Sequence, residues 1–172
     1  MPAERAPIPT FVSFAHDDVE DLKALRRHLT PVIRGRVLEV WDDGRLSGGQ
    51  QWSQEIEQAI ARSRIFVLLL TPSFLASDYI LEKELPAIRR SWESPGTLVL
   101  PILLRNCFWR HVVAALQVIP TDDSGKVRAI YSWRRREDAF QRAAEQVDKA
   151  LEAHVGDAAP PLIDWTVRGT RS

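Results

Sequence analysis

The sequence has little cysteine, no excess of charge of either sign and no long apolar run. It contains 172 residues and a single cysteine, so an internal disulfide is excluded and a reducing compartment is expected. The 23 basic and 23 acidic side chains balance, which argues against a protein whose main task is to neutralise nucleic-acid phosphates. The longest apolar run, residues 65–70, is far shorter than the ~20 residues of a membrane span. We therefore expect a cytoplasmic protein that binds neither nucleic acid nor membrane directly.

Motifs for metal and phosphate binding are also missing. The four histidines lack the spacing of metal ligands, so no metal site is expected. The glycines at 44, 48 and 49 are not followed by the Gly-Lys-Ser/Thr of a phosphate-binding loop. The run Arg134-Arg135-Arg136 forms either a basic patch or, as most such runs do, a solvated turn.

Apolar runs alternate with amphipathic stretches along the chain. The pattern predicts strands over residues 11–15, 37–41, 65–70, 98–104 and 127–131. It predicts helices over residues 17–33, 52–63, 78–92 and 137–154, and a short helix within 107–116. This order favours an α/β fold in which a five-stranded parallel sheet carries helices on both faces, a three-layer sandwich.

One domain accounts for most of the chain. We assign residues 9–155 to it, residues 1–8 to an N-terminal extension, and residues 156–172, rich in Pro, Gly and small residues, to a C-terminal linker or tail. In such sheets ligands bind beyond the carboxyl ends of the strands, where the strand order reverses. The residues that follow the first three strands are therefore the first candidates for a site.

Glu84 is out of place on its predicted helix. At 100° per residue it falls within the apolar stripe, one turn from both Ile80 and Ile88. A buried carboxylate costs several kcal/mol unless it is paired or hydrogen-bonded, so a compensating group or a function is expected. An ion pair with a neighbouring arginine, or the positive end of a helix, would also explain it. Pro86 is expected to kink the helix close by.

Three segments carry a family resemblance: TFVSFAHDD, the long block from VWDDGRLSGGQQW to ILEKELPAI, and LVLPILLRNCFW. In this order and spacing they resemble the Toll/interleukin receptor (TIR) domain, and bacterial members in particular, over residues 9–155. The resemblance implies a flavodoxin-like fold, in agreement with the pattern of strands and helices.

Many TIR domains cleave NAD+, and their catalytic glutamate lies in a Ser-x-aromatic-x-x-x-x-Glu motif. The matching residues are Ser77, Tyr79 and Glu84. The resemblance thus implies that NAD+ is the substrate, that no cofactor is required and that Glu84 is catalytic. Nicotinamide leaves as a neutral base, so one carboxylate that stabilises the ribose cation would suffice without a general acid. Whether the product is ADP-ribose or a cyclic isomer stays open.

Further substrate contacts are expected around the carboxyl ends of the strands. The candidates are Phe14, Ala15, His16, Asp17, Trp41, Asp42, Arg45, Ser77 and Tyr79. The aromatic side chains among them offer stacking surfaces, and the polar ones offer contacts to ribose or phosphate. Core packing is the competing explanation for Phe14 and Trp41, and helix capping for Asp17.

The loop after the second strand is, by resemblance, the assembly loop, which completes the pocket of a neighbouring subunit. It includes Asp43, Gly44, Leu46, Ser47, Gly48 and Gly49. Family members often have Pro-Gly where this chain has Ser47-Gly48-Gly49, and Trp-Cys where it has Tyr79-Ile80. The expected partners are other TIR domains and a fused or separate sensor domain, and the expected role is anti-phage defence by NAD+ depletion.

Three alternatives remain. A TIR domain can act only as a scaffold, through TIR–TIR contacts. A phosphoacceptor receiver domain shares the fold but needs an aspartate at the end of the third strand, where this chain has Leu70 and Thr71. A nucleoside deoxyribosyltransferase uses a glutamate on a related sheet but lacks this glycine-bearing loop.

Overall fold

The computed structural model describes residues 5–42 and 54–155. Its sheet contains β1 (Ile8–Ser13), β2 (Leu38–Asp42), β3 (Ile65–Leu70) and β4 (Leu98–Leu103). All pairs are parallel, in the order β2-β1-β3-β4. This is the strand order of flavodoxin-like folds, and it reverses between β1 and β3. The third strand has the bounds predicted from the sequence, residues 65–70. All six of its side chains are buried, which explains why its apolar run is continuous.

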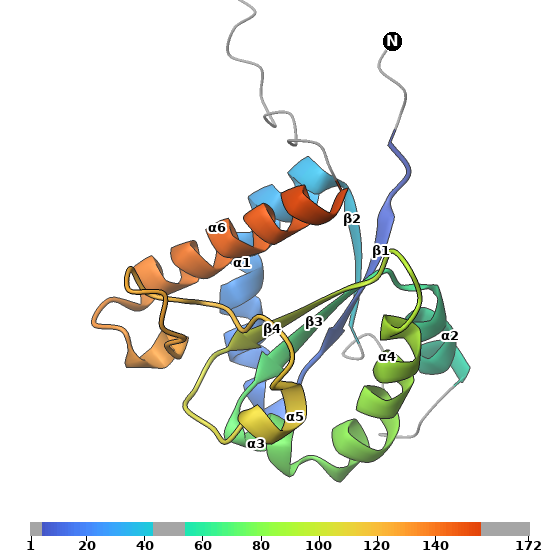
Figure 1. The fold of residues 1–172 in the computed structure, drawn as a ribbon, viewed down its shortest axis with the longest axis horizontal. Helices are drawn as coiled ribbons and strands as arrows, with labels where there is room; N and C mark the ends of the chain where they lie inside the picture. Colours follow the sequence, from blue (N-terminus) through green and yellow to red (C-terminus); the bar gives the residue numbers. More distant parts are fainter. Residues whose placement is uncertain (1–4, 43–53, 156–172) are drawn as a thin grey trace, which may run out of the picture.

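Helices cover both faces of this sheet (Figure 1). Their bounds are α1 Val19–Arg36, α2 Gln54–Arg62, α3 Pro72–Ala76, α4 Leu85–Trp92, α5 Arg110–Val113 and α6 Arg136–Val155. A π-helical turn, η3 (Ile80–Glu84), precedes α4, and 3₁₀ turns occupy His16–Asp18 and Ile130–Ser132. Helices α1 and α6 pack together on one face, and α2 and α4 pack together on the other. The three-layer sandwich predicted from the sequence is confirmed.

Strand β1 separates two hydrophobic cores. Side chains alternate along β1 and the two residues after it. Val12 and Phe14 thus belong to the core under α1 and α6, whereas Phe11 and Ala15 belong to the core under α2 and α4. Because β1 pairs with β2 on one side and β3 on the other, it is fixed within the sheet. A side chain at its carboxyl end is therefore held in a defined place beside the reversal of strand order.

The fifth strand predicted over residues 127–131 is wrong for the described part of the chain. Val127 makes an isolated antiparallel bridge with Thr121, and residues 130–132 form a 3₁₀ turn. The place beside β4 is taken by Ile119, which bridges Ile102 in the parallel direction. The next residue that would face β4, Thr121, donates its backbone N–H to Oε1 of Gln146 in α6 instead, so the ladder does not continue. The outer edge of β4 is therefore covered by one bridging residue instead of a strand.

No helix in residues 5–42 and 54–155 combines the length and the apolar character needed to cross a membrane.

Candidate functional site

Glu84 is the last residue of the π-helical turn and is fully buried. The backbone N–H of Leu85 donates to the carbonyl of Ile80, five residues earlier, where an α-helix would use the residue four positions back. Pro86 explains this geometry, since its ring crowds the carbonyl of Glu82 and it offers no N–H to that carbonyl. The predicted helix over residues 78–92 is thus confirmed as a helical segment, with a widened turn where a kink was expected.

The predicted burial of Glu84 is confirmed, and the structure identifies a group that compensates for it. The hydroxyl of Ser13, at the end of β1, donates a hydrogen bond of 3.1 Å to Oε2 of Glu84. Both side chains have no exposed surface. Ser13 was not predicted, although a sequence signal existed. It is a polar residue at an inward position between Phe11 and Ala15, at the end of the first strand.

Four of the predicted substrate contacts lie on the same face of the sheet as Glu84. Ala15 is buried there, and Trp41 and Tyr79 pack against the same core. The Trp41 ring stacks on Phe11 with the ring centroids 5.4 Å apart. The hydroxyl of Ser77 accepts a hydrogen bond of 3.3 Å from the backbone N–H of Ile80, and so caps the helical segment that carries Glu84.

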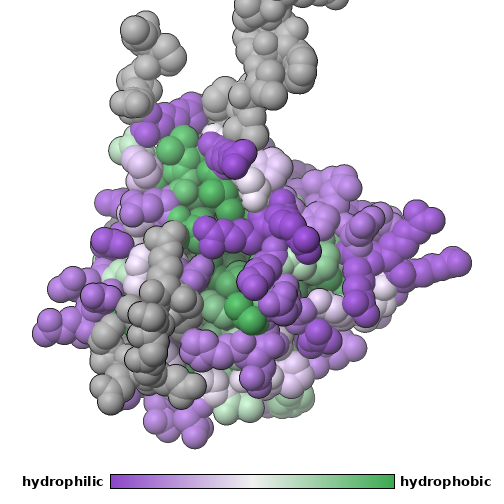
Figure 2. Space-filling view, turned by 180° about the vertical axis from the view of Figure 1, so that it is seen from behind, coloured by the Kyte–Doolittle hydropathy of each residue, from purple (hydrophilic) through white to green (hydrophobic). Residues whose placement is uncertain are grey.

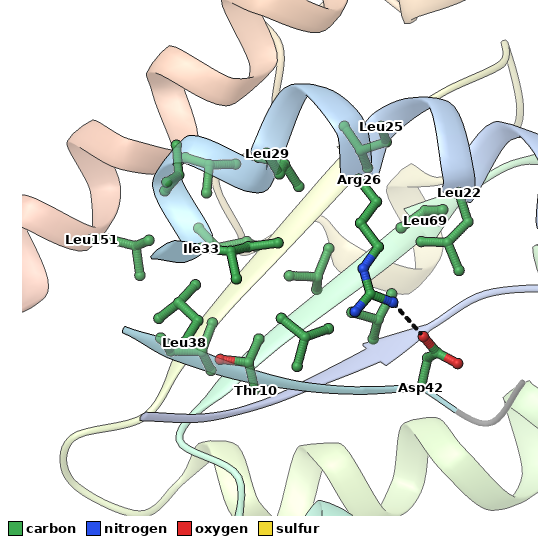
Figure 3. A pocket seen from close by; sticks show the side chains of 17 residues that line it. Thr10, Leu22, Leu25, Arg26, Leu29, Ile33, Leu38, Asp42, Leu69 and Leu151 are labelled. Atoms are coloured by element: carbon green, nitrogen blue, oxygen red, sulfur yellow. Dashed lines mark hydrogen bonds and ion pairs between the residues drawn. The ribbon is translucent and has the colours of Figure 1, made fainter. Parts of the chain in front are cut away.

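Two other predicted contacts point to the opposite face. Phe14 is buried in the core under α1 and α6, which is the packing role considered for it above. Asp42 is buried and accepts a hydrogen bond of 3.2 Å from Arg26 of α1 (Figure 3). Adjacent residues of a strand point to opposite faces, so Trp41 and Asp42 cannot both face Glu84.

The remaining predicted residues divide into exposed ones and ones outside the described chain. His16 and Asp17 are exposed and begin three residues after the end of β1, on the carboxyl side of that strand. Arg45 lies outside the described residues. So do the predicted assembly-loop residues Asp43, Gly44, Leu46, Ser47, Gly48 and Gly49.

Asp18 forms a second buried polar contact near this edge. It precedes α1 directly, but its side chain does not cap that helix and instead accepts a hydrogen bond from the hydroxyl of Thr71. Thr71 in turn accepts a hydrogen bond of 3.0 Å from the N–H of Phe74 and caps α3. Burial raises the pKa of Asp18 above its ordinary value, and the hydrogen bond from Thr71 opposes this in part.

We expect Asp18→Asn, which keeps an acceptor for Thr71, to be more stable than the parent at neutral pH. Burial penalises the charged form of Asp18 in the folded state. The cost of the buried charge to the stability of the parent is therefore complete above the raised pKa. It is absent below the ordinary value of 3.8, where the carboxyl is protonated in both the folded and the unfolded state. The stability difference between Asp18→Asn and the parent should thus shrink as the pH falls. Urea unfolding across this pH range measures it, with Asp17→Asn at the exposed neighbour as control. An equal difference at every pH would contradict the prediction.

Glu84 lines neither of two hollows that lie between described elements of the fold. One is a small cavity of about 40 Å³ between α1 and the sheet, lined mostly by aliphatic side chains beside the Arg26–Asp42 pair (Figure 3). The other is an open groove of about 550 Å³ between α4 and α5, where Leu81, Trp92 and Val112 are partly exposed. The view from behind shows a band of apolar surface within hydrophilic surroundings (Figure 2). Residues 5–42 and 54–155 contain no cluster of side chains suited to a metal ion.

Comparison with known proteins identifies the class. Residues 10–144 match the family described as TIR domain, and the chain belongs to this family. The uncharacterized protein y4lF of Sinorhizobium fredii is 30% identical over 152 residues, which make up 88% of this chain and 46% of that protein. The chain therefore spans about half the length of the curated relative that it matches.

Solved structures that contain TIR domains are similar to this chain. The RPS4 and RRS1 TIR domain heterodimer has a TM-score of 0.52 and 11% identity, and the match covers 85% of this chain and 97% of that one. This similarity supports the fold assignment. The TIR domains of the activated Roq1 resistosome, which recognises the pathogen effector XopQ, have a TM-score of 0.45 and 19% identity, with coverage of 88% and 86%.

Proposed function

We propose that this TIR domain is an NAD+ glycohydrolase with Glu84 as its catalytic residue. The observation that carries the proposal is a fully buried carboxylate beside the carboxyl end of β1, next to the reversal of strand order. A buried ionisable side chain at such an edge is costly for folding and typical of functional sites. Membership of the TIR family, which includes NAD+-cleaving enzymes, supports the same assignment.

The proposed reaction breaks the bond between ribose C1′ and the nicotinamide nitrogen. The bonding electrons leave with nicotinamide, whose ring nitrogen thereby loses its positive charge. The ribose becomes cationic, and an ionised Glu84 stabilises this cation. Water then adds at C1′ and releases a proton, which gives ADP-ribose; attack by an adenine nitrogen would give a cyclic isomer. Trp41 and Tyr79, on the same face as Glu84, are the aromatic residues proposed to contact the substrate.

Activity on this basis needs a step that uncovers Glu84. In the single chain the side chain has no exposed surface, so NAD+ cannot contact it without displacing the groups that cover it. We infer that self-assembly through TIR–TIR contacts provides this step. A role in cytoplasmic defence by NAD+ depletion, with a sensor domain that triggers assembly, is part of the same proposal.

We expect nicotinamide release per molecule of protein to rise with protein concentration, because assembly is a bimolecular or higher-order step. Incubation with NAD+ over a wide range of protein concentrations, with the products identified by mass, measures both rate and product. Analytical ultracentrifugation of the same samples reports assembly. Constant specific activity across the range would contradict the requirement for assembly. No NAD+ cleavage at any concentration, with assembly still present, would favour the scaffold function instead.

A further inference from the structure

The carboxyl end of β1 places one hydroxyl group against the buried carboxylate of Glu84. We propose that Ser13 is a positioning residue for Glu84: its hydroxyl orients the carboxylate and favours its ionised form. The inference rests on the function proposed above. It starts from the hydrogen bond of 3.1 Å between two fully buried side chains that are 71 residues apart in sequence.

Apolar residues of one hydrophobic core neighbour this hydrogen bond. Ala15, Ile80 and Ala87, which neighbour Ser13 and Glu84 in sequence or along the helix, belong to the hydrophobic core under α2 and α4. An ionised carboxylate in such surroundings is unfavourable unless donors stabilise it. A hydroxyl that donates to a carboxylate favours its charged form, which is the form that the proposed reaction needs.

A second buried hydroxyl on β1, that of Thr10, has a different kind of acceptor from the hydroxyl of Ser13. Thr10 is also buried, but it faces the α1 side and donates to the backbone carbonyl of Ile8, two residues earlier. A buried hydroxyl on β1 can thus find its acceptor locally. The hydroxyl of Ser13 instead reaches the helical segment that carries Glu84.

The donor, Ser13, also belongs to a strand that sheet pairing holds in place. Ser13 pairs with Leu68 of β3, within the central part of the sheet. Its acceptor, Glu84, is on the π-helical turn that Pro86 favours. A catalytic group is most effective when neighbours with fixed positions orient it, and strands hold such neighbours better than loops do.

The test compares Ser13→Ala with Ser13→Thr, which retains the hydroxyl, and with the matched control Thr10→Val. Ser13→Ala should lower kcat for nicotinamide release by about ten- to a hundred-fold, with little change in KM. It should also move the acidic limb of the pH profile to higher pH. Ser13→Thr should retain the parental pH profile, and Thr10→Val should retain the parental rate. Thermal unfolding of each variant confirms that it is folded.

A second measurement does not depend on turnover. Carbon-13 NMR of the Glu84 carboxyl, assigned with Glu84→Gln, should show its titration moving to higher pH in Ser13→Ala and staying in place in Thr10→Val. If the parent cleaves no NAD+ but this shift occurs, the proposed function fails and the assignment of Ser13 to the carboxylate stands. If folded Ser13→Ala keeps the parental kcat and carboxyl titration, or becomes faster than the parent, the inference is overturned.

Discussion

Glu84→Gln should reduce nicotinamide release by at least about a hundred- to a thousand-fold, because it removes the charge that stabilises the ribose cation. The change is nearly isosteric, and the amide oxygen of glutamine can still accept the hydrogen bond from Ser13. The fold is therefore expected to survive. Nicotinamide release at a protein concentration that supports assembly measures the effect.

Glu82 provides the matched control for this experiment. It lies on the same π-helical turn, two residues before Glu84, but its side chain is exposed. Glu82→Gln makes the same chemical change and should leave the rate within the error of the parent. Circular dichroism and thermal unfolding establish that both variants are folded. A folded Glu84→Gln variant that cleaves NAD+ at the parental rate would end the proposal of a catalytic carboxylate.

Leu69→Ala should have the largest effect on stability, a loss of about 3 to 5 kcal/mol in the free energy of unfolding. Leu69 is the fifth residue of β3 and has no exposed surface. It already lines the cavity of about 40 Å³ between α1 and the sheet (Figure 3). Truncation would enlarge an existing void beside β3. This strand is paired with β1 on one side and β4 on the other, so it cannot easily shift to fill the space. The loss is a large part of the ~5–15 kcal/mol that stabilises a typical domain.

Leu81→Ala is the control for this substitution. Leu81 is 36% exposed, so the same truncation removes little buried surface and should cost less than about 1 kcal/mol. Urea-induced unfolding of both variants and the parent gives the comparison. An equal loss in the free energy of unfolding at the two positions would contradict the prediction that burial of Leu69 makes its truncation more costly.

The sequence was sufficient for the layers of the fold and for the key carboxylate. Residues 65–70 form a continuous apolar run, and the strand has those bounds. The helical periodicity around Ile80 and Ile88 indicated that Glu84 faces inward, and it is buried. Both results follow from local patterns, since a period of two or of 3.6 residues determines which side chains share a face.

The features that were missed depend on contacts distant in sequence. The partner of Glu84 is 71 residues away, and no local pattern links Ser13 to it. The strand predicted at residues 127–131 has a suitable composition, but Ile119 occupies the place beside β4. The division of Trp41 and Asp42 between two faces depends on the phase of β2 within the sheet, which strand pairing sets.

The end of β2 is anchored on both faces of the sheet, through the stacking of Trp41 on Phe11 and the ion pair of Asp42 with Arg26. The chain is held again from Gln54, where α2 begins and buries Ile56 in the core. Both junctions are therefore secured by the scaffold itself. We expect these two junctions to serve as splice points at which segments from related proteins replace residues 43–53 one at a time.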